Sequence, residues 1–309
     1  MMKILVTGGA GFIGSHVLER LLKDKNNIIT VIDNLDSGST QNIPSGVVFI
    51  REDVRSPKII NIFQTNAFDA VIHLAAQTMV PYSITHPRED ADINLMGLIN
   101  VLEAARLTGV KSVVFSSSAA VYGNNNNLPL RENELLAPTS FYGITKMTTE
   151  HYLRVYHNLY NINTTVLRFA NVYGERQGMG GEGGVVCIFS KKIAANEGID
   201  VFGDGEQTRD FVYVQDIAKV ICGAIEHKGF GIYNVSTNTE VAVNELITVF
   251  EKVSGKKIQV NYLPARQGDI YRSVLSNKAL KLEFNIDKFT SLEEGLKSTY
   301  NYFITSERK

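Results

Sequence analysis

The sequence predicts an α/β protein with a doubly wound parallel sheet and a second, smaller α/β domain at its C-terminal end. Two observations indicate this fold class. Short runs rich in β-branched residues recur up to residue 170, and amphipathic helical patterns lie between most of them. Apolar strands that alternate with helices form parallel sheets covered on both faces. Ligands are then expected at the carboxyl ends of the strands.

The predicted elements follow one another regularly in the first half of the chain, where apolar periodicity distinguishes strands from helices. The strands are expected at residues 3–7, 28–33, 47–53, 70–76, 111–118 and 163–170, and the main helices at residues 12–24, 97–109 and 143–160. After Asn171 this rhythm gives way to a glycine-rich loop at residues 174–184 and to shorter mixed elements.

The length of 309 residues exceeds the usual size of one domain, so we expect two domains. Residues 1–170 are predicted to form the domain with the parallel sheet, and residues 171–309 the substrate domain. Residues 216–236 are predicted to return to the first domain, because a helical pattern there is followed by the strand-like run IYNVS. The boundary is therefore expected to be interleaved.

Composition and charge exclude several classes of protein. The formal net charge is −1, so the chain is not organised around contacts with a nucleic acid backbone. The two cysteines, Cys187 and Cys222, cannot form a disulfide framework and have no metal-ligand spacing, so no metal is expected. The N-terminus lacks the features of a signal peptide, and no apolar stretch reaches the ~18 residues of a membrane span. We expect a soluble, cytoplasmic protein without a membrane partner.

The first predicted strand runs directly into Gly8, Gly11 and Gly14 at the start of a helix. The first glycine permits a tight turn, the second lets the backbone approach a pyrophosphate, and the third lets helix and strand pack closely. Asp33 ends the second strand, 19 positions after Gly14, where a carboxylate accepts hydrogen bonds from the adenosine ribose and repels a 2′-phosphate. The pattern predicts a Rossmann-type domain that binds NAD rather than NADP. A plain turn and a turn aspartate are the alternatives.

Tyr142 and Lys146 lie four residues apart in a predicted helix, so they share one face. Bringing a tyrosine pKa from ~10 to near neutrality takes ~4 kcal/mol, about what one cation at ~4 Å supplies at an effective dielectric near 20. Lys146 is therefore expected to lower the pKa of Tyr142. Ser118 ends a hydroxyl-rich strand and is expected to hydrogen-bond the reacting oxygen. A chance Tyr-x-x-x-Lys spacing is the alternative.

Eight segments together resemble the extended short-chain dehydrogenase/reductase family, and within it the UDP-glucose/UDP-galactose 4-epimerases. They are TGGAGFIG (7–14), DNLDSG (33–38), HLAAQ (73–77), SSSAAVYG (116–123), YGITK (142–146), RFANVYG (168–174), TRDFVYVQD (208–216) and RQGD (266–269). The resemblance implies that a hydride moves from sugar C4 to tightly held NAD, that the 4-keto sugar rotates, and that the hydride returns to the opposite face. Tyr142 would remove the O4 proton, Lys146 would hold the nicotinamide ribose, and Ser118 would orient O4.

The same resemblance implies two sets of binding residues. The NAD site would be lined by Gly8, Gly11, Phe12, Ile13, Gly14, Asp33, Asn34, Leu35, Asp36, Ser37, Gly38, Asp53, Val54, Leu74, Ala75, Ala76, Gln77, Asn94, Tyr142 and Lys146. The UDP-sugar site would be lined by Val80, Ser83, Ser118, Tyr142, Asn171, Arg209, Arg266 and Ser273, of which Asn171 and the two arginines would bind the diphosphate. For each arginine an ordinary surface role is the alternative, and His73 is expected to be a core residue.

Ala119 and Ala120 distinguish this sequence from two related groups of enzymes. Sugar-nucleotide 4,6-dehydratases carry an Asp-Glu pair at these positions, and related decarboxylases carry Glu at the second. A site with hydroxyls and no acid can oxidise, release and re-reduce a sugar, so epimerisation is expected. A lyase or dehydrogenase that uses another acid, and a non-catalytic dinucleotide-binding protein, are the alternatives.

Ser273 lies seven residues after Arg266, where epimerases restricted to glucose and galactose tend to carry a tyrosine against the sugar C2 substituent. A serine leaves room for an N-acetyl group. We therefore expect UDP-GlcNAc and UDP-GalNAc as substrates beside UDP-glucose and UDP-galactose, unless Tyr271 or Arg272 fills the space. The resemblance also implies a homodimer formed through helices at about residues 87–108 and 141–161.

Overall fold

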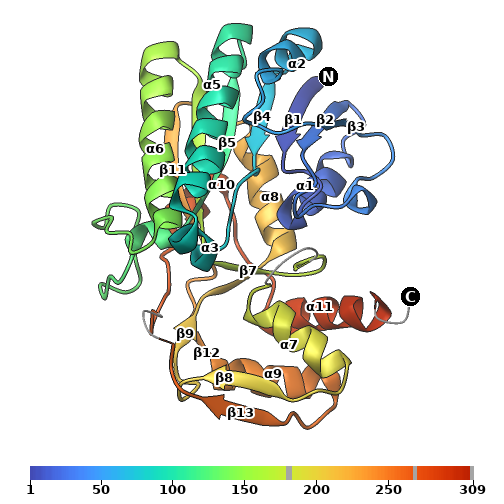
Figure 1. Ribbon diagram of the computed structural model, residues 1–309, viewed down its shortest axis with the longest axis vertical. Coiled ribbons are helices and arrows are strands. Elements are labelled where there is room, and N and C mark those ends of the chain that lie inside the picture. The colour runs from blue at the N-terminus through green and yellow to red at the C-terminus, as the bar shows by residue number, and fades with distance from the viewer. Residues whose placement is uncertain (179–182, 267–269, 307–309) are drawn as a thin grey trace. The chain divides into compact units, whose positions relative to one another are not determined.

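The computed structural model describes residues 1–178, 183–266 and 270–306 (Figure 1). Residues 267–269 of the RQGD motif lie outside the described residues, whereas Arg266 lies within them. The chain divides into two compact units. Unit 1 comprises Met1–Asn124, Glu132–Phe169 and Ala218–Tyr233, and unit 2 comprises Asn125–Arg131, Ala170–Ile217 and the chain from Asn234 onward.

Unit 1 is built on a seven-stranded sheet with the order β11-β6-β5-β4-β1-β2-β3. Strands β1 to β6 pair in parallel, and their order is the one found in dinucleotide-binding α/β domains. The predicted fold class is confirmed. The strands are β1 (Met2–Thr7), β2 (Asn27–Asp33), β3 (Val48–Arg51), β4 (Ala70–His73), β5 (Ser112–Ser118), β6 (Asn163–Phe169) and β11 (Phe230–Val235).

Helices cover both faces of this sheet, and a π-helical turn interrupts the long helical stretch before residue 108. The helices are α1 (Phe12–Leu21), α2 (Ile59–Asn66), α3 (Val80–Thr85), α4 (Pro87–Ala91), the π-helix η2 (Asp92–Met96), α5 (Gly97–Thr108), α6 (Phe141–Tyr160) and α8 (Val214–Ala224). Two 3₁₀ turns, η1 (Thr40–Asn42) and η3 (Ala119–Tyr122), follow strand ends.

Side chains of the strands alternate between the two faces, as the pleat of a strand requires. Leu5 packs into a core formed with α2, α5 and α6. Its neighbour Ile4 lies instead with Leu21 of α1 and with Ile225, which follows α8. His73 is a core residue, as predicted: it is 1% exposed and its Nδ1 lies 2.9 Å from the Thr7 hydroxyl.

A buried ion pair joins β6 to α6. Arg168 donates to both carboxylate oxygens of Glu150, at 2.9 and 2.6 Å, and the two side chains are 2% and 4% exposed. The Arg168 guanidinium also donates to the Tyr122 hydroxyl at 2.8 Å, and the Ser117 hydroxyl donates to Glu150 at 2.5 Å. Buried charges are stable only when such hydrogen bonds satisfy them, so the network fixes α6 against the ends of β5 and β6.

Unit 2 contains shorter mixed elements, as expected after Asn171. β7 (Asn171–Tyr173) pairs in parallel with β10 (Phe211–Tyr213), β8 (Ile199–Phe202) in parallel with β13 (Val260–Leu263), and β9 (Thr208–Arg209) antiparallel with β12 (Val241–Ala242). α11 (Leu292–Ser306) packs against α7 (Val185–Ala194) and α9 (Val243–Ser254), and α10 (Lys278–Phe284) precedes it. Within the described ranges, no helix is long and apolar enough to cross a membrane.

Residues 125–131 lie in unit 2, whereas the sequence-based division assigned them to the first domain. The Leu130 N–H donates to the Val274 carbonyl at 2.9 Å, and the Leu130 carbonyl accepts the Ser276 N–H at 2.7 Å and the Asn234 side-chain amide at 3.0 Å. These partners lie more than a hundred residues away along the chain, so no local sequence pattern predicts these hydrogen bonds.

Candidate functional site

β1 turns tightly into α1 next to the point where the strand order reverses, between β1 and β4. Gly8 has φ +71°, and a Cβ on it would lie 2.6 Å from the Ala75 backbone nitrogen. A Cβ on Gly14 would lie 2.3 Å from the Gly8 carbonyl oxygen. Gly11 precedes α1 and supplies no side-chain cap, which leaves the N–H groups of the first helical turn to an anion. The turn therefore fits a dinucleotide pyrophosphate.

Asp33 ends β2 beside this turn. Its carboxylate accepts the Ala10 N–H at 2.9 Å and the Leu35 N–H at 2.8 Å. Burial raises the pKa of Asp33, and these two backbone donors oppose the rise. The Asn34 side-chain amide donates to Asp53 at 3.0 Å. The structure thus brings residues 33–35 and Asp53 together at the edge where adenosine is expected.

Gln77 and Asn94 come from separate elements and meet beyond the end of β4. The Gln77 N–H donates to Asn94 Oδ1 at 2.9 Å, and Asn94 Nδ2 donates to the Gln77 carbonyl at 3.0 Å. Asn94 lies in the π-helix η2, and π-helical turns are frequent at functional sites. Val54, which is also predicted to line the NAD site, packs with its side chain in the hydrophobic core of unit 1.

Ser118, Tyr142 and Lys146 meet at the carboxyl end of β5. Ser118 is the last residue of β5, and its hydroxyl lies near enough to the Tyr142 phenol to lower the pKa of that phenol. Lys146 lies one turn after Tyr142 on α6, and its Nζ is 5.8 Å from the centre of the Tyr142 ring. Lys146 Nζ also donates to the Ser116 carbonyl at 2.8 Å. A hydroxyl, a phenol and an ammonium group thus lie together at the same edge of the sheet as the glycine turn, where the parallel strands have their carboxyl ends.

The expectation that Lys146 lowers the pKa of Tyr142 is wrong for these residues by themselves. Burial raises the pKa of Tyr142, the hydrogen bond with Ser118 opposes this, and the charge of Asp90 adds to the rise. Lys146 is 3% exposed, and its burial lowers its own pKa to about 8. The physical reason is the desolvation of the buried phenol, while the Lys146 ammonium donates its hydrogen bond to the Ser116 carbonyl.

Unit 2 holds the residues predicted to bind the diphosphate, together with Ser273. Arg209 Nη1 donates to the Thr208 carbonyl at 2.8 Å and to the Tyr271 carbonyl at 3.4 Å. The Thr208 N–H also donates to the Tyr271 carbonyl, at 2.9 Å, so Arg209 lies beside the segment that contains the half-buried Ser273.

Two further predicted diphosphate residues lie in the same unit. The Arg266 guanidinium stacks on Phe202, with its central carbon 3.8 Å from the centre of the ring. Asn171 begins β7 and is exposed, and its N–H donates to the Asp210 carbonyl at 2.9 Å. Phe202 was not singled out from the sequence, where one aromatic residue in a short strand carries no distinguishing pattern.

α3 carries the predicted substrate residues Val80 and Ser83 in unit 1. Val80 is 37% exposed, whereas Ser83 is 0% exposed and its hydroxyl donates to the Val80 carbonyl at 2.7 Å. In this arrangement the Ser83 hydroxyl closes a bond within its own helix, and Val80 is the residue of the two that a ligand can reach.

The chain matches the model of the NAD dependent epimerase/dehydratase family over residues 4–236. It belongs to this family. A putative UDP-glucose 4-epimerase of Methanocaldococcus jannaschii is 41% identical to it over 307 residues, which cover 99% of each chain. The family is NAD-dependent, in agreement with the cofactor predicted from the glycine turn and Asp33.

Two solved structures share the fold of this family member along nearly its whole length. One is a UDP-glucose 4-epimerase of Thermotoga maritima with UDP-glucose, which has a TM-score of 0.96 and 39% identity and covers 99% of this chain and 100% of its own. The other is a UDP-N-acetylglucosamine 4-epimerase of Methanobrevibacter ruminantium in complex with UDP-N-acetylmuramic acid, with a TM-score of 0.94, 35% identity and 99% coverage of each chain.

Sequence reasoning missed two polar residues of this epimerase/dehydratase family member beside the site. Asp90 on α4 is fully buried, and its carboxylate accepts hydrogen bonds from Gln77, Asn94 and Thr145. The four-residue spacing of Asp90 and Asn94 is a signal that could have revealed this pair. No local signal marks Thr145, because its hydroxyl meets Asp90 from another helix.

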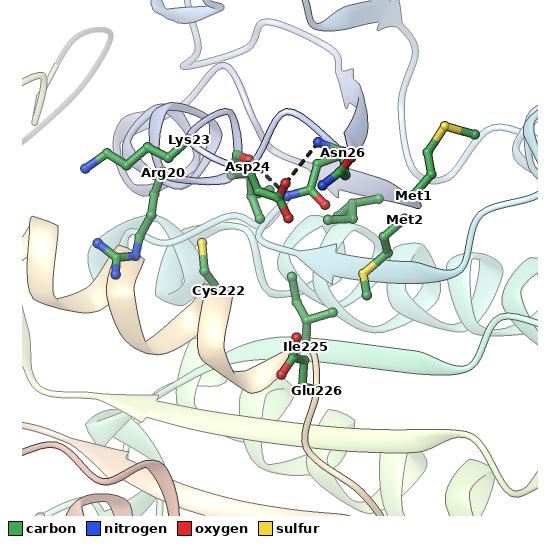
Figure 2. Close-up of a pocket in the computed structure, with 12 residues that line it drawn as sticks. Met1, Met2, Arg20, Lys23, Asp24, Asn26, Cys222, Ile225 and Glu226 are labelled. Carbon is green, nitrogen blue, oxygen red and sulfur yellow. Dashed lines mark hydrogen bonds between the residues drawn. The ribbon is translucent and has the colours of Figure 1, made fainter.

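A pocket at the opposite end of the sheet does not belong to this site (Figure 2). It is lined by Met2 and Asn27, which begin β1 and β2, and by Arg20 of α1 and Cys222 of α8. Parallel sheets bind ligands at the carboxyl ends of their strands. The residues that line this pocket include none of the predicted site residues.

Lys146→Met, with the dinucleotide removed, is expected to be more stable than the wild type at pH 7 by up to about 3 kcal/mol. The pKa of Lys146 is lowered to about 8 in the folded chain, so the unfavourable burial of its charge is fully present below that pH. The difference should shrink to about 1 kcal/mol at pH 10, because the lysine is then neutral in the folded chain and only partly protonated in the unfolded chain.

Urea unfolding of both proteins at the two pH values measures this difference. Lys58→Met serves as a matched control, because that side chain is 74% exposed. The control should change stability by no more than about 0.5 kcal/mol at either pH. A Lys146→Met protein less stable than the wild type at pH 7 would contradict the expected burial cost.

Proposed function

We propose that this chain is an NAD-dependent UDP-sugar 4-epimerase. The observation that carries the proposal is the assembly of Ser118, Tyr142 and Lys146 at the end of β5, where Ala119 and Ala120 follow in η3 and provide no acid. The names of the relatives support it, since a similar chain is a putative UDP-glucose 4-epimerase and a similar structure is a UDP-glucose 4-epimerase with UDP-glucose.

The residues of unit 1 divide the proposed reaction among themselves. Tyr142 takes the proton from the sugar O4 and later returns it, and Ser118 orients that oxygen by its hydrogen bond. Lys146 holds the nicotinamide ribose through its ammonium group. Bound NAD would supply the hydride acceptor for C4 and a positive nicotinamide ring, whose charge would favour the phenolate of Tyr142.

The residues predicted to hold NAD supply backbone groups at the glycine turn and polar side chains, among them the carboxylate of Asp33. The turn at Gly8–Gly14 and the start of α1 would hold the pyrophosphate, and Asp33 would accept the adenosine ribose hydroxyls. In unit 2, Arg209, Arg266 and Asn171 would bind the UDP diphosphate, because arginine forks suit phosphate oxygens. These assignments, the roles of the two domains and the cytoplasmic location stay predictions.

A net lyase or decarboxylase is the second reading, and product mass separates it from epimerisation. Incubating the protein with UDP-glucose, UDP-galactose, UDP-GlcNAc, UDP-GalNAc and UDP-glucuronate, followed by mass spectrometry, should give products of unchanged mass. Loss of water or of carbon dioxide would contradict the epimerase proposal. No turnover of any sugar by protein with bound NAD would support the reading as a non-catalytic dinucleotide-binding protein.

Tyr142→Phe is expected to fold and retain bound NAD but to lose epimerisation by about three orders of magnitude or more, because general acid–base catalysis contributes typically 10²–10⁴-fold. The rate of interconversion of UDP-glucose and UDP-galactose, measured without added NAD, provides the test. The wild type should carry NAD through purification, since the hydride is returned in every cycle. Near-normal turnover of Tyr142→Phe would exclude Tyr142 as the base.

The small side chain of Ser273 supports a substrate range that includes N-acetylated sugars. The two residues that could fill the room left by the serine have other partners: the Arg272 guanidinium is paired with Glu240 at 2.6 Å, and the Tyr271 hydroxyl donates to Asp204 at 3.2 Å. Ser273 itself is half-buried. The similarity to a UDP-N-acetylglucosamine 4-epimerase is consistent with this substrate range.

Ser273→Tyr is expected to lower kcat/KM for UDP-GlcNAc by about 100-fold while changing that for UDP-glucose less than about threefold. The added ring would overlap the N-acetyl group and leave a hydroxyl at C2 undisturbed. Steady-state kinetics on both sugar nucleotides measures the ratio of the two kcat/KM values. Ser273→Ala serves as the control, because it changes the side chain without adding volume. Wild-type protein that turns over UDP-glucose but not UDP-GlcNAc would show that the pocket argument is wrong.

A homodimer formed through α5 and α6 is the second part of the proposal. The two helices pack side by side in unit 1 (Figure 1). α6 buries one face in the core, yet it also exposes an apolar stripe with helical spacing, made of Phe141, Ile144, Tyr152, Val155 and Leu159. An exposed apolar stripe of this kind is typical of an association surface.

Val155→Glu is expected to convert the dimer into a monomer, because it places a charge in the middle of the apolar stripe. Leu282→Glu serves as the matched control, since Leu282 is 88% exposed on α10 and lies outside the stripe. Light scattering coupled to size-exclusion chromatography gives the mass of each protein. A monomeric wild type, or a Val155→Glu protein that stays dimeric, would contradict this interface.

A further inference from the structure

Asp90 is a buried carboxylate to which the proposed reaction gives no role. It lies on the short helix α4 and is 0% exposed. Its Oδ1 accepts Gln77 Nε2 at 2.7 Å and Asn94 Nδ2 at 3.1 Å, and its Oδ2 accepts the Thr145 hydroxyl at 3.0 Å. The three donors come from the loop after β4, from η2 and from α6. One carboxylate thus joins three elements of unit 1.

Backbone groups orient both amides so that each turns an N–H group toward Asp90. The Gln77 side-chain oxygen accepts the Met79 N–H, and its Nε2 donates to the Met79 carbonyl at 3.1 Å. The Asn94 amide is held by the Gln77 backbone, with which it exchanges two hydrogen bonds. Two amide donors therefore converge on one carboxylate oxygen, and hydrogen bonds to an ionised acceptor are stronger than those to a neutral one.

Thr145 carries this network into the helix with the proposed catalytic residues. It directly precedes Lys146 and is 5% exposed, and its hydroxyl oxygen also lies 2.9 Å from the Tyr142 carbonyl oxygen, so the two acceptors share one hydroxyl hydrogen. Asp90 therefore reaches the helical turn that presents both Tyr142 and Lys146. On its other side it holds Gln77 and Asn94, which are predicted to contact NAD.

The charge of Asp90 acts on the same two side chains. It raises the pKa of Lys146 against the opposing effect of burial, and it adds to the raised pKa of Tyr142. Both effects favour the protonated forms, so Asp90 keeps the lysine cationic and makes the phenol a weaker acid.

The other titratable groups around α4 are exposed or paired elsewhere. Arg88 of α4 and the preceding His86 are exposed. The paired groups are Tyr82 of α3 with Glu89, Asp92 of η2 with Arg55, and Glu150 of α6 with Arg168. The negative charge that acts on the Tyr142 and Lys146 pair from this side therefore comes from Asp90.

We propose that Asp90 is a positioning residue for the epimerase reaction: it locks Gln77, Asn94 and Thr145 into one arrangement and fixes a negative charge beside Lys146. This inference rests on the proposed function. The predicted binding of NAD by Gln77 and Asn94 and the position of the proposed base Tyr142 would then both depend on one buried carboxylate.

Asp90→Asn tests the proposal, because it keeps the shape of the side chain, removes the charge and weakens the hydrogen bonds that the carboxylate accepts. We expect the NAD content after purification to fall several-fold and kcat to fall about tenfold or more. Both limbs of the kcat–pH profile should move to lower pH by about one unit, since loss of the anion lowers the pKa of Tyr142 and of Lys146 together. Glu89→Gln, which removes a charge from the exposed next residue, should match the wild type in all three measurements.

Three outcomes would overturn the proposal: wild-type behaviour of Asp90→Asn, a lower kcat with an unshifted pH profile, or an equal change in Glu89→Gln. Thr145→Val carries the test if Asp90→Asn does not fold, because it removes only the hydroxyl link to α6. It should lower kcat several-fold with little change in KM for the sugar nucleotide, and an unchanged kcat would likewise overturn the proposal. A wild type without epimerase activity would instead overturn the proposed function, while the comparison of NAD content would still test Asp90.

Discussion

Burial of the Lys146 ammonium group is the constraint on which the arrangement of the active end of unit 1 depends. A charged amine excluded from water is costly unless nearby groups compensate it. Here the Ser116 carbonyl accepts one of its hydrogens at 2.8 Å, and the carboxylate of Asp90 supplies opposite charge. Even so its pKa is lowered to about 8. The strand end, the π-helix and α6 must therefore keep their relative positions for the lysine to remain cationic.

The buried pair of Glu150 and Arg168 provides that rigidity from the other side of α6. The two charges pair with each other and bond to Ser117 and Tyr122, so they hold the helix in place. The Glu150 carboxylate also raises the pKa of Lys146, as the charge of Asp90 does. Asp90 in addition raises the pKa of Tyr142.

The predicted dinucleotide site of unit 1 depends mainly on backbone geometry, whereas the predicted diphosphate site of unit 2 depends on side-chain chemistry. The dinucleotide turn offers N–H groups and close approach, which glycine provides at Gly8 and Gly14 whatever the surrounding side chains are. The residues expected to bind the sugar nucleotide, such as Arg209 and Arg266, lie instead on short strands and connecting segments of unit 2. Substrate preference can therefore change through a few side chains, as at Ser273, without altering the parallel sheet.

The sequence by itself determined the parallel sheet, the dinucleotide turn and the candidate trio of Ser118, Tyr142 and Lys146. Each follows from short-range chemistry: alternation of apolar residues, glycines at a strand end, and side chains one helical turn apart. Only the tertiary structure decided that residues 125–131 join unit 2, that Ser83 is buried, and that Asp90 connects Gln77, Asn94 and Thr145. It also reversed the expected direction of the Tyr142 pKa. Desolvation and the direction of an ammonium group depend on residues that are distant in the chain, and local spacing holds no information about them.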